Sequence, residues 1–182
     1  MKRIQTLLSA VLLTVLSTNL YAQKNKTDYD YNLKKAYEVL QEEKDEAKAL
    51  ELLNKQMEET PDNVAALMFR AKIFFRREEY GQALQDINHA LKVNKPRKTE
   101  VANSMLHWWK ADIYRDMGDW QSAAASYKTA YELARKDDKD NLQRISFDYA
   151  QALFSLDDYD GSEAIYREML AADETEDRKS VV

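Results

Sequence analysis

One spacing of large and small side chains occurs three times in this 182-residue chain. A large aromatic residue is followed by a small residue, a large apolar residue and, in two of the copies, another small residue. The three stretches are EYGQALQDINHAL from Glu79, DWQSAAASYKTAY from Asp119 and DYDGSEAIYREML from Asp158. A spacing that recurs in this way indicates a chain built from repeated structural units rather than from one irregular core.

The residue types between these stretches predict helices. The chain has only 3 glycines and 2 prolines, which leaves too little turn chemistry for a sheet of many strands. Ala, Leu, Glu, Lys, Gln and Arg fill nearly every stretch after Tyr31, with apolar residues three and four positions apart. We therefore expect an all-α protein.

Each copy extends upstream into a preceding helix, so the repeated unit is a pair of helices. The matched sets are Ala71, Phe74, Tyr80, Ala83, Ile87 and Ala90; Ala111, Tyr114, Trp120, Ala123, Tyr127 and Ala130; and Ala150, Leu153, Tyr159, Ser162, Tyr166 and Met169. A degraded fourth copy lies one period earlier and rests mainly on Ala49 and Leu53. Both prolines, Pro61 and Pro96, come just after a second helix, where a residue that cannot continue a helix is tolerated.

The spacing has a physical reason. Two antiparallel helices pack closely only if the residue at their crossing is small, as alanine and serine are. Large residues one or two turns away then fill the space between one helical hairpin and the next. A single hairpin cannot bury its apolar face, so several must stack.

This pattern resembles the tetratricopeptide repeat, a helix-turn-helix unit of 34 residues. The resemblance implies a right-handed superhelix, or solenoid, of about four repeats over residues 30–172. The predicted repeats cover residues 30–61, 64–96, 104–136 and 143–172. Extra residues around Lys95–Glu100 and Arg135–Asn141 would lengthen a second helix or a loop between repeats.

The N-terminus has the layout of a secretory signal peptide. Lys2 and Arg3 precede the apolar run Ile4–Leu16, and small residues ending at Ala22 offer a cleavage site. We expect a signal peptide over residues 1–22, a short linker over 23–29, and an exported protein that is periplasmic or secreted. A retained N-terminal anchor is the alternative, although the run is too short to span a bilayer comfortably.

Composition narrows the partners. The chain has no cysteine, which excludes disulfides and thiolate metal sites. Its formal net charge of −5 becomes more negative if Lys2 and Arg3 are removed, which disfavours nucleic acid and anionic lipid. Residues 143–182 hold 10 acidic and 4 basic residues, so the charge gathers toward the C-terminus. We expect no membrane span in the mature chain.

Signs of catalysis are weak. His89 and His107 stand apart, without the paired spacing of a metal site, so no metal or cofactor is expected. The stretch Asp157–Gly161 hints at a calcium loop, but Leu156 and Arg167 occupy the positions of the strongest ligands. It is better interpreted as a repeat turn. We therefore expect a protein that is not an enzyme.

The family resemblance also implies where a partner binds. In a solenoid of this kind the first helix of each repeat lines the concave side, and three positions around its small residue face the groove. They are Met68, Lys72 and Phe75; Trp108, Asp112 and Arg115; and Phe147, Gln151 and Phe154. The hypothesis is a groove for a partner peptide or helix, with Trp108 and Phe75 as anchors and Lys72 and Arg115 selecting acidic groups. The alternative is that these side chains pack between hairpins.

Three functions remain open from the sequence. The first is a non-catalytic protein-protein interaction scaffold of the bacterial envelope. The second is the N-terminal module of a larger envelope protein whose C-terminal domain carries the activity, and the third is a glycan-binding accessory protein. The polar tail over residues 173–182 leaves the last hairpin uncovered, through truncation of a longer array, self-association of the last helix, or a marginal end. Truncation is the interpretation that we favour.

Overall fold

The computed structural model describes residues 31–95 and 101–180 of the chain. These ranges contain helices, turns and connecting residues, and no strand is found within them, which confirms the predicted all-α class. The chain divides into two compact units between Pro61 and Asp62. The predicted signal peptide over residues 1–22 and the linker over 23–29 lie outside the described residues.

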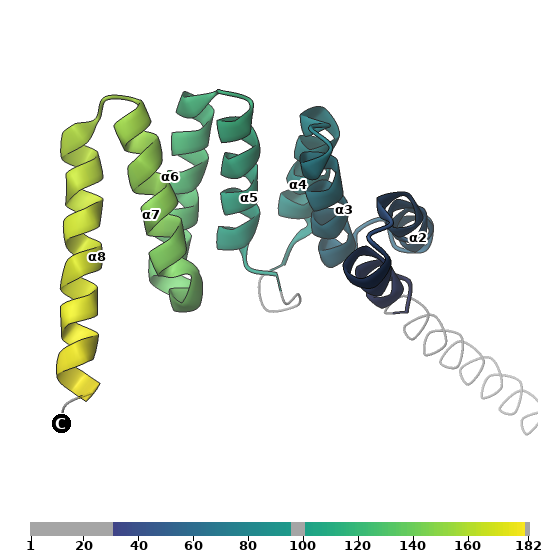
Figure 1. Cartoon of the computed structure of the whole chain (residues 1–182), viewed down its shortest axis with the longest axis horizontal. Helices are drawn as coiled ribbons and strands as arrows, with labels where there is room; N and C mark the ends of the chain where they lie inside the picture. The colour runs from purple at the N-terminus through teal and green to yellow at the C-terminus, as the bar shows by residue number, and fades with distance from the viewer. Residues whose placement is uncertain (1–30, 96–100, 181–182) are drawn as a thin grey trace, which may run out of the picture. The chain divides into compact units, whose positions relative to one another are not determined.

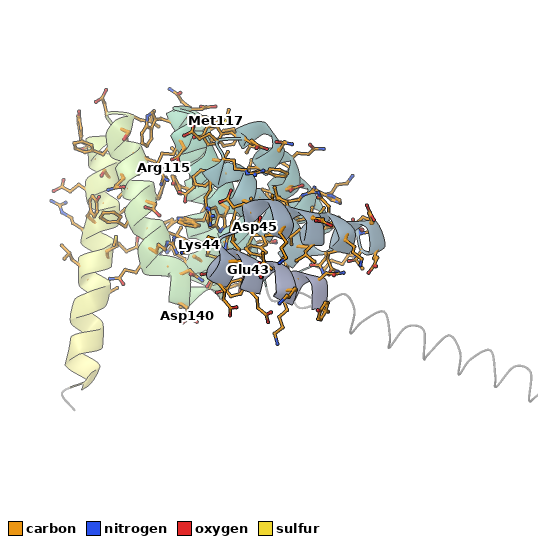
Figure 2. The ribbon with its side chains drawn as sticks, turned by 45° about the vertical axis from the view of Figure 1, so that its right-hand side comes forward. Glu43, Lys44, Asp45, Arg115, Met117 and Asp140 are labelled. Atoms are coloured by element: carbon orange, nitrogen blue, oxygen red, sulfur yellow. The ribbon has the colours of Figure 1, made fainter. Side chains whose placement is uncertain are left out.

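The N-terminal unit is one helical hairpin. Residues 31–38 are helical and lead into the π-helix η1 (Val39–Glu43), and the second helix is α2 (Glu46–Glu59). Between them, Lys44 has a left-handed backbone with φ of 57°, and the Asp45 side chain caps α2. Figure 2 labels both residues at this turn. The helical residues of this hairpin run from 31 to 43 and from 46 to 59.

The core of this hairpin contains the residues that supported the degraded copy. Ala49 and Leu53 on α2 are fully buried, together with Ala36 and Val39 from the preceding helical residues. Small residues therefore occupy both helices where they face each other, as close packing of a helix pair requires.

The C-terminal unit contains three helical hairpins. Its helices are α3 (Val64–Arg76), α4 (Tyr80–Val93), α5 (Asn103–Asp116), α6 (Trp120–Asp137), α7 (Lys139–Ser155) and α8 (Tyr159–Ser180). Figure 1 shows them following one another in chain order, and the contacts join α3 to α4, α5 to α6 and α7 to α8 as hairpins. Contacts of α4 with α5 and of α6 with α7 then join the hairpins into a stack.

The predicted small residues lie at the helix crossings. Ala83 and Ala123 are fully buried, and Ser162 is 3% exposed. Their partners on the first helices, Ala71 and Ala111, are equally buried. The small residues of the three copies are thus equally buried, which gives each pair of helices the room to approach closely.

All four hairpin turns use the same backbone device. The residue two positions before the second helix has a positive φ: Lys44, Glu78, Gly118 and Asp157. In the last three turns the following residue donates its backbone N–H to the carbonyl five residues earlier, as from Asp119 to Tyr114 at 2.9 Å. This 6→1 bond is the helix-ending arrangement that favours glycine, yet only one of the four residues is glycine.

Helix boundaries differ from the sequence prediction near the C-terminus. The extra residues of 135–141 are divided between α6, which runs to Asp137, and α7, which begins at Lys139, four residues before the predicted 143. Helix α8 continues to Ser180, past the predicted repeat end at 172. Good helix-forming residues simply extend a helix until a capping residue or turn ends it.

Candidate interaction surface

The first helices α3, α5 and α7 carry the nine residues expected to line a groove. On α3, Met68, Lys72 and Phe75 are half-buried. On α5, Trp108 and Asp112 are only 3% and 5% exposed, and Arg115 is half-buried. On α7, Phe147 and Phe154 are 44% and 60% exposed, and Gln151 is also exposed. Accessible apolar surface therefore lies on α7 rather than evenly along the three helices.

Trp108 is not exposed as a surface anchor, contrary to the expectation from the sequence. Its Nε1 donates a hydrogen bond of 2.7 Å to Oδ2 of Asp148 on α7. The Arg144 guanidinium carbon, also on α7, lies 3.9 Å from the centre of the Trp108 ring. Its large ring thus packs between two hairpins, which is the alternative that the sequence left open.

Asp112 and Arg115 form a buried network with a tyrosine of α6. Tyr127 donates its hydroxyl hydrogen to Oδ1 of Asp112, and Arg115 Nη1 donates to the same oxygen at 2.7 Å. Arg115 Nη1 also lies 2.9 Å from the Tyr127 hydroxyl, and Arg115 Nε lies 3.1 Å from Asp116. Arg115 is therefore engaged within the hairpin, and Asp112 is not accessible to a partner.

Burial controls the ionisation of this network. It raises the pKa of Asp112 to about 6, against the lowering effects of the Tyr127 hydrogen bond and the Arg115 charge. Burial and the Asp112 charge raise the pKa of Tyr127, which keeps its phenol protonated as a donor. Asp112, Arg115 and Tyr127 therefore bind one another within the α5–α6 hairpin, and this contact accounts for their positions.

A second cluster joins α3 to α5. The Lys72 ammonium lies 4.8 Å from the centre of the Trp109 ring, and the Phe75 ring meets Trp109 edge-on at 5.9 Å. Trp109 in turn lies 5.0 Å from Trp108, also edge-on. Burial, followed by the positive charge of Arg144, lowers the pKa of Lys72. Lys72 and Arg144 lie over the neighbouring rings of Trp109 and Trp108, and their positive charges repel each other.

Arg144 is the residue that sequence reasoning missed. It lies three residues before Phe147 and seven before Gln151, so helical periodicity places it on the face already chosen for α7. The family resemblance gives three groove positions per helix, which on α7 are Phe147, Gln151 and Phe154. Arg144, one turn earlier on the same face, is not among them. Among the described residues, neither Arg144 nor Lys72 forms an ion pair with a carboxylate.

The remaining candidates from the sequence have local roles. His89 Nε2 lies 2.9 Å from Asp62 Oδ1, and His107 is half-buried, with its pKa lowered by burial and then by Lys110. In the α7–α8 turn, Asp158 caps the helix by accepting from the Gly161 N–H at 3.0 Å. Over residues 31–95 and 101–180, no group of three His, Asp or Glu side chains is placed to hold a metal ion.

A comparison with family models identifies a repeat family for the C-terminal part of the chain. A family model described as tetratricopeptide repeat matches residues 100–175, which span α5 to α8 except for the end of α8. Residues 100–175 therefore match the tetratricopeptide repeat family. A comparison with curated protein sequences gave no significant match.

Solved structures of tetratricopeptide repeat proteins share the fold over most of the chain. MamA is 16% identical, with 89% of this chain and 86% of that chain covered and a TM-score of 0.67. A tetratricopeptide repeat protein from Parabacteroides merdae is 21% identical, covering 81% and 54%, with a TM-score of 0.67. YrrB, described as having an unusual peptide-binding site, is 17% identical, covering 86% and 74%, with a TM-score of 0.64. These likenesses show an all-α solenoid fold.

In the described part of the chain, every helix is too short or too polar to cross a membrane. The tetratricopeptide repeat fold suggests a protein-interaction scaffold as the general function. Among the nine expected positions, the exposed rings are Phe147 and Phe154 of α7.

Proposed function

We propose that this protein is a non-catalytic scaffold that binds an acidic, extended segment of a partner protein across the inner face of α3, α5 and α7. The observation that carries the proposal is the placement of Lys72 and Arg144. Each cation lies over an indole ring, and neither is neutralised by a carboxylate among the described residues. Peptide binding by YrrB provides a precedent on the same fold.

The electrostatics favour an anion at this place. The charge of Arg144 contributes to the lowered pKa of Lys72, which means that the protonated form of the lysine is destabilised. A carboxylate of a partner placed near both cations would reduce their mutual repulsion and stabilise the charged lysine. The indole faces keep the two side chains in position, which reduces the entropy lost when they bind a ligand.

The neighbouring part of α7 supplies apolar contact. Phe147 and Phe154 expose much of their rings, and the exposed Gln151 lies between them on the same helical face. Exposed aromatic side chains beside charged groups are typical of protein interfaces. The partner segment would therefore combine acidic residues with apolar residues that contact these rings.

The test uses an arrayed library of peptides, in which each acidic sequence has matched versions with Asp and Glu changed to Asn and Gln or to Lys. The protein should prefer acidic peptides, with affinity falling as salt rises. Lys72→Glu should weaken that binding about tenfold or more. Lys128→Glu is the matched control, because Lys128 is an exposed lysine of α6 with the same change of charge.

The proposal fails if the neutral or basic versions bind as well as the acidic ones. It also fails if Lys128→Glu weakens binding as much as Lys72→Glu, because net charge alone would then explain the effect. Circular dichroism of both variants should show unchanged helix content, since neither side chain belongs to the buried core.

The proposed setting is the bacterial envelope. Support comes from the charged, apolar and small residues that succeed one another over residues 1–22. Expression with these residues in a bacterial host should give a periplasmic or secreted product whose N-terminus, read by mass spectrometry, begins near Gln23. An uncleaved cytoplasmic product would overturn this location while leaving the binding proposal intact.

A further inference from the structure

The last two hairpins of the chain place equivalent residues in different environments. Adding 39 to a residue number of α5 or α6 gives its counterpart on α7 or α8, as with the crossing residues Ala123 and Ser162. Trp108, Tyr127 and Tyr131 are then equivalent to Phe147, Tyr166 and Leu170. The first three are 3%, 0% and 7% exposed.

Helix α7 covers the α5–α6 members of this set. Tyr131 stacks with Tyr149 of α7 at 5.6 Å between ring centres, and Trp108 is held by Arg144 and Asp148. Ile145 and Ala152 of α7 belong to the same buried cluster as Trp108, Tyr127 and Tyr131. The surface of the α5–α6 hairpin is thus covered by a helix whose apolar residues are Ile145, Tyr149 and Ala152.

The α7–α8 members keep large apolar side chains, and no helix within residues 31–95 and 101–180 covers them in this way. Phe147 is 44% exposed and Leu170 is 64% exposed, while Tyr166 is half-buried and stacks edge-on with Phe147 at 6.1 Å. We call the surface formed by Phe147, Tyr166 and Leu170 the end face. Clustered apolar residues of this size on a charged protein are typical of an interaction surface.

The charges around the end face restrict its occupant. Asp157, Asp158 and Asp160 lie at the turn into α8, and Glu163 follows one turn later. Two bases lie nearby: Arg167 is paired with Glu163 at 2.8 Å, and Arg144 lies over the Trp108 ring of the preceding hairpin. A second copy docking through the same face would bring these carboxylates together, and like charges oppose such self-association. A basic occupant would be attracted instead.

We propose that the end face docks a basic amphipathic helix of a partner protein. Its apolar stripe would contact Leu170, Tyr166 and Phe147 with the spacing that α7 uses on the preceding hairpin, and its basic residues would lie toward the aspartates of the α7–α8 turn. This surface shares Phe147 with the proposed inner-face site, but it adds Tyr166 and Leu170 of α8 and uses neither Lys72 nor Arg144.

Two synthetic helices based on α7 provide the probe. Both have the sequence of residues 139–156 and keep its apolar residues. In the basic peptide Asp140 and Asp148 are replaced by lysine, and in the acidic peptide Lys139 and Arg144 are replaced by glutamate. Fluorescence anisotropy of each labelled peptide measures its affinity for the full chain, and sedimentation equilibrium of the chain alone measures self-association.

Two variants distinguish binding at the end face from nonspecific binding to exposed apolar residues. Leu170→Glu introduces a charge on the end face without disturbing a buried side chain, since Leu170 is 64% exposed. Met117→Glu makes the same kind of change at another exposed apolar residue, 50% exposed in the α5–α6 turn, which Figure 2 labels. Circular dichroism should give the same helix content for both variants.

The proposal predicts that the basic peptide binds about tenfold or more tightly than the acidic one, and that Leu170→Glu weakens this binding about tenfold while Met117→Glu leaves it within about twofold. It is overturned if the basic peptide does not bind, if both peptides bind equally, or if both variants weaken binding equally. A dimer of the chain alone that Leu170→Glu dissociates would identify a second copy as the occupant and would also overturn it. Because Lys72→Glu should leave the basic peptide bound, failure here is distinguishable from failure of the proposed groove.

Discussion

Arg144 of α7 lies over the indole ring of Trp108 of α5, with 3.9 Å between the guanidinium carbon and the ring centre. The same tryptophan donates its Nε1 hydrogen to Asp148, one helical turn further along α7. The Trp108 ring thus joins two consecutive hairpins. Arg144 covers the face of the ring, and Asp148 accepts a hydrogen bond from its edge. At this junction the Arg144 charge is near enough to Lys72 to contribute to the lowering of the pKa of that lysine.

Loss of the Arg144 side chain should weaken the junction measurably. We expect Arg144→Ala to lower the free energy of unfolding by about 0.5–2 kcal/mol, because a partly exposed cation–π contact and its covering of Trp108 are lost. Urea denaturation followed by tryptophan fluorescence measures the change. Arg167→Ala is the control, since Arg167 has only an exposed pair with Glu163 and should cost less than about 0.5 kcal/mol. Equal costs would mean that the stacking on Trp108 contributes nothing special.

The left-handed turn residues should respond oppositely to substitution. Gly118 has φ of 78° with no neighbouring atom in the way of a Cβ, so Gly118→Ala should cost about 1 kcal/mol through backbone strain alone. Glu78 has φ of 60° and is exposed, so Glu78→Gly should stabilise the protein by about 0.5–1 kcal/mol. Thermal or urea unfolding of the two variants measures both signs. A stabilising alanine at 118 would contradict the turn geometry.

The helix crossing at Ala123 should not accept a larger side chain. Ala123→Leu should destabilise the protein by about 1–3 kcal/mol or more, because Ala123 is fully buried where α6 meets α5. Ala125→Leu is the matched control, because Ala125 is exposed on the same helix and its change should stay within about 0.5 kcal/mol. The comparison of their urea midpoints tests the small-residue rule directly. Similar midpoints would show that the crossing can expand.

Asp112 should make the stability of the protein fall as pH rises between about 4 and 6. Its pKa is raised from 3.8 to about 6 in the folded protein, so over this window the unfolded chain releases a proton that the folded chain retains. The group's stabilising contribution is complete below pH 3.8 and is lost as pH passes 6, with a total of up to about 3 kcal/mol. Asp112→Asn should remove this component, and urea titrations of both proteins from pH 4 to 7 measure it.

The control for that measurement is Asp116→Asn. Asp116 is exposed and also contacts Arg115, so its substitution changes the same arginine without removing a buried acid. It should leave the difference in stability between pH 4 and 7 almost unchanged. If Asp112→Asn and the original protein have the same pH dependence, the burial of Asp112 does not raise its pKa.

The sequence by itself determined the repeated architecture. Alanine at 83 and 123 and serine at 162 predicted close helix crossings, and the structure has those crossings at each place. The prediction succeeds because the crossing depends on two local properties, the helical period and the size of one side chain. The sequence also predicted a repeat turn at Asp157–Gly161. This prediction is confirmed because helix capping and chain reversal depend only on neighbouring residues.

Only the tertiary structure decided which side chains of the inner face are accessible. Nothing near Trp108 in the sequence shows that its ring is covered, because the carboxylate that binds its edge comes 40 residues later on another hairpin. The same holds for Asp112, which is buried against Tyr127 of α6. A periodic pattern assigns a residue to a face of its helix, but its exposure depends on whether the next hairpin brings a side chain long enough to cover it. Of the nine expected positions, Phe147 and Phe154 of α7 keep exposed rings, since within the described residues no further hairpin packs on α7 and α8.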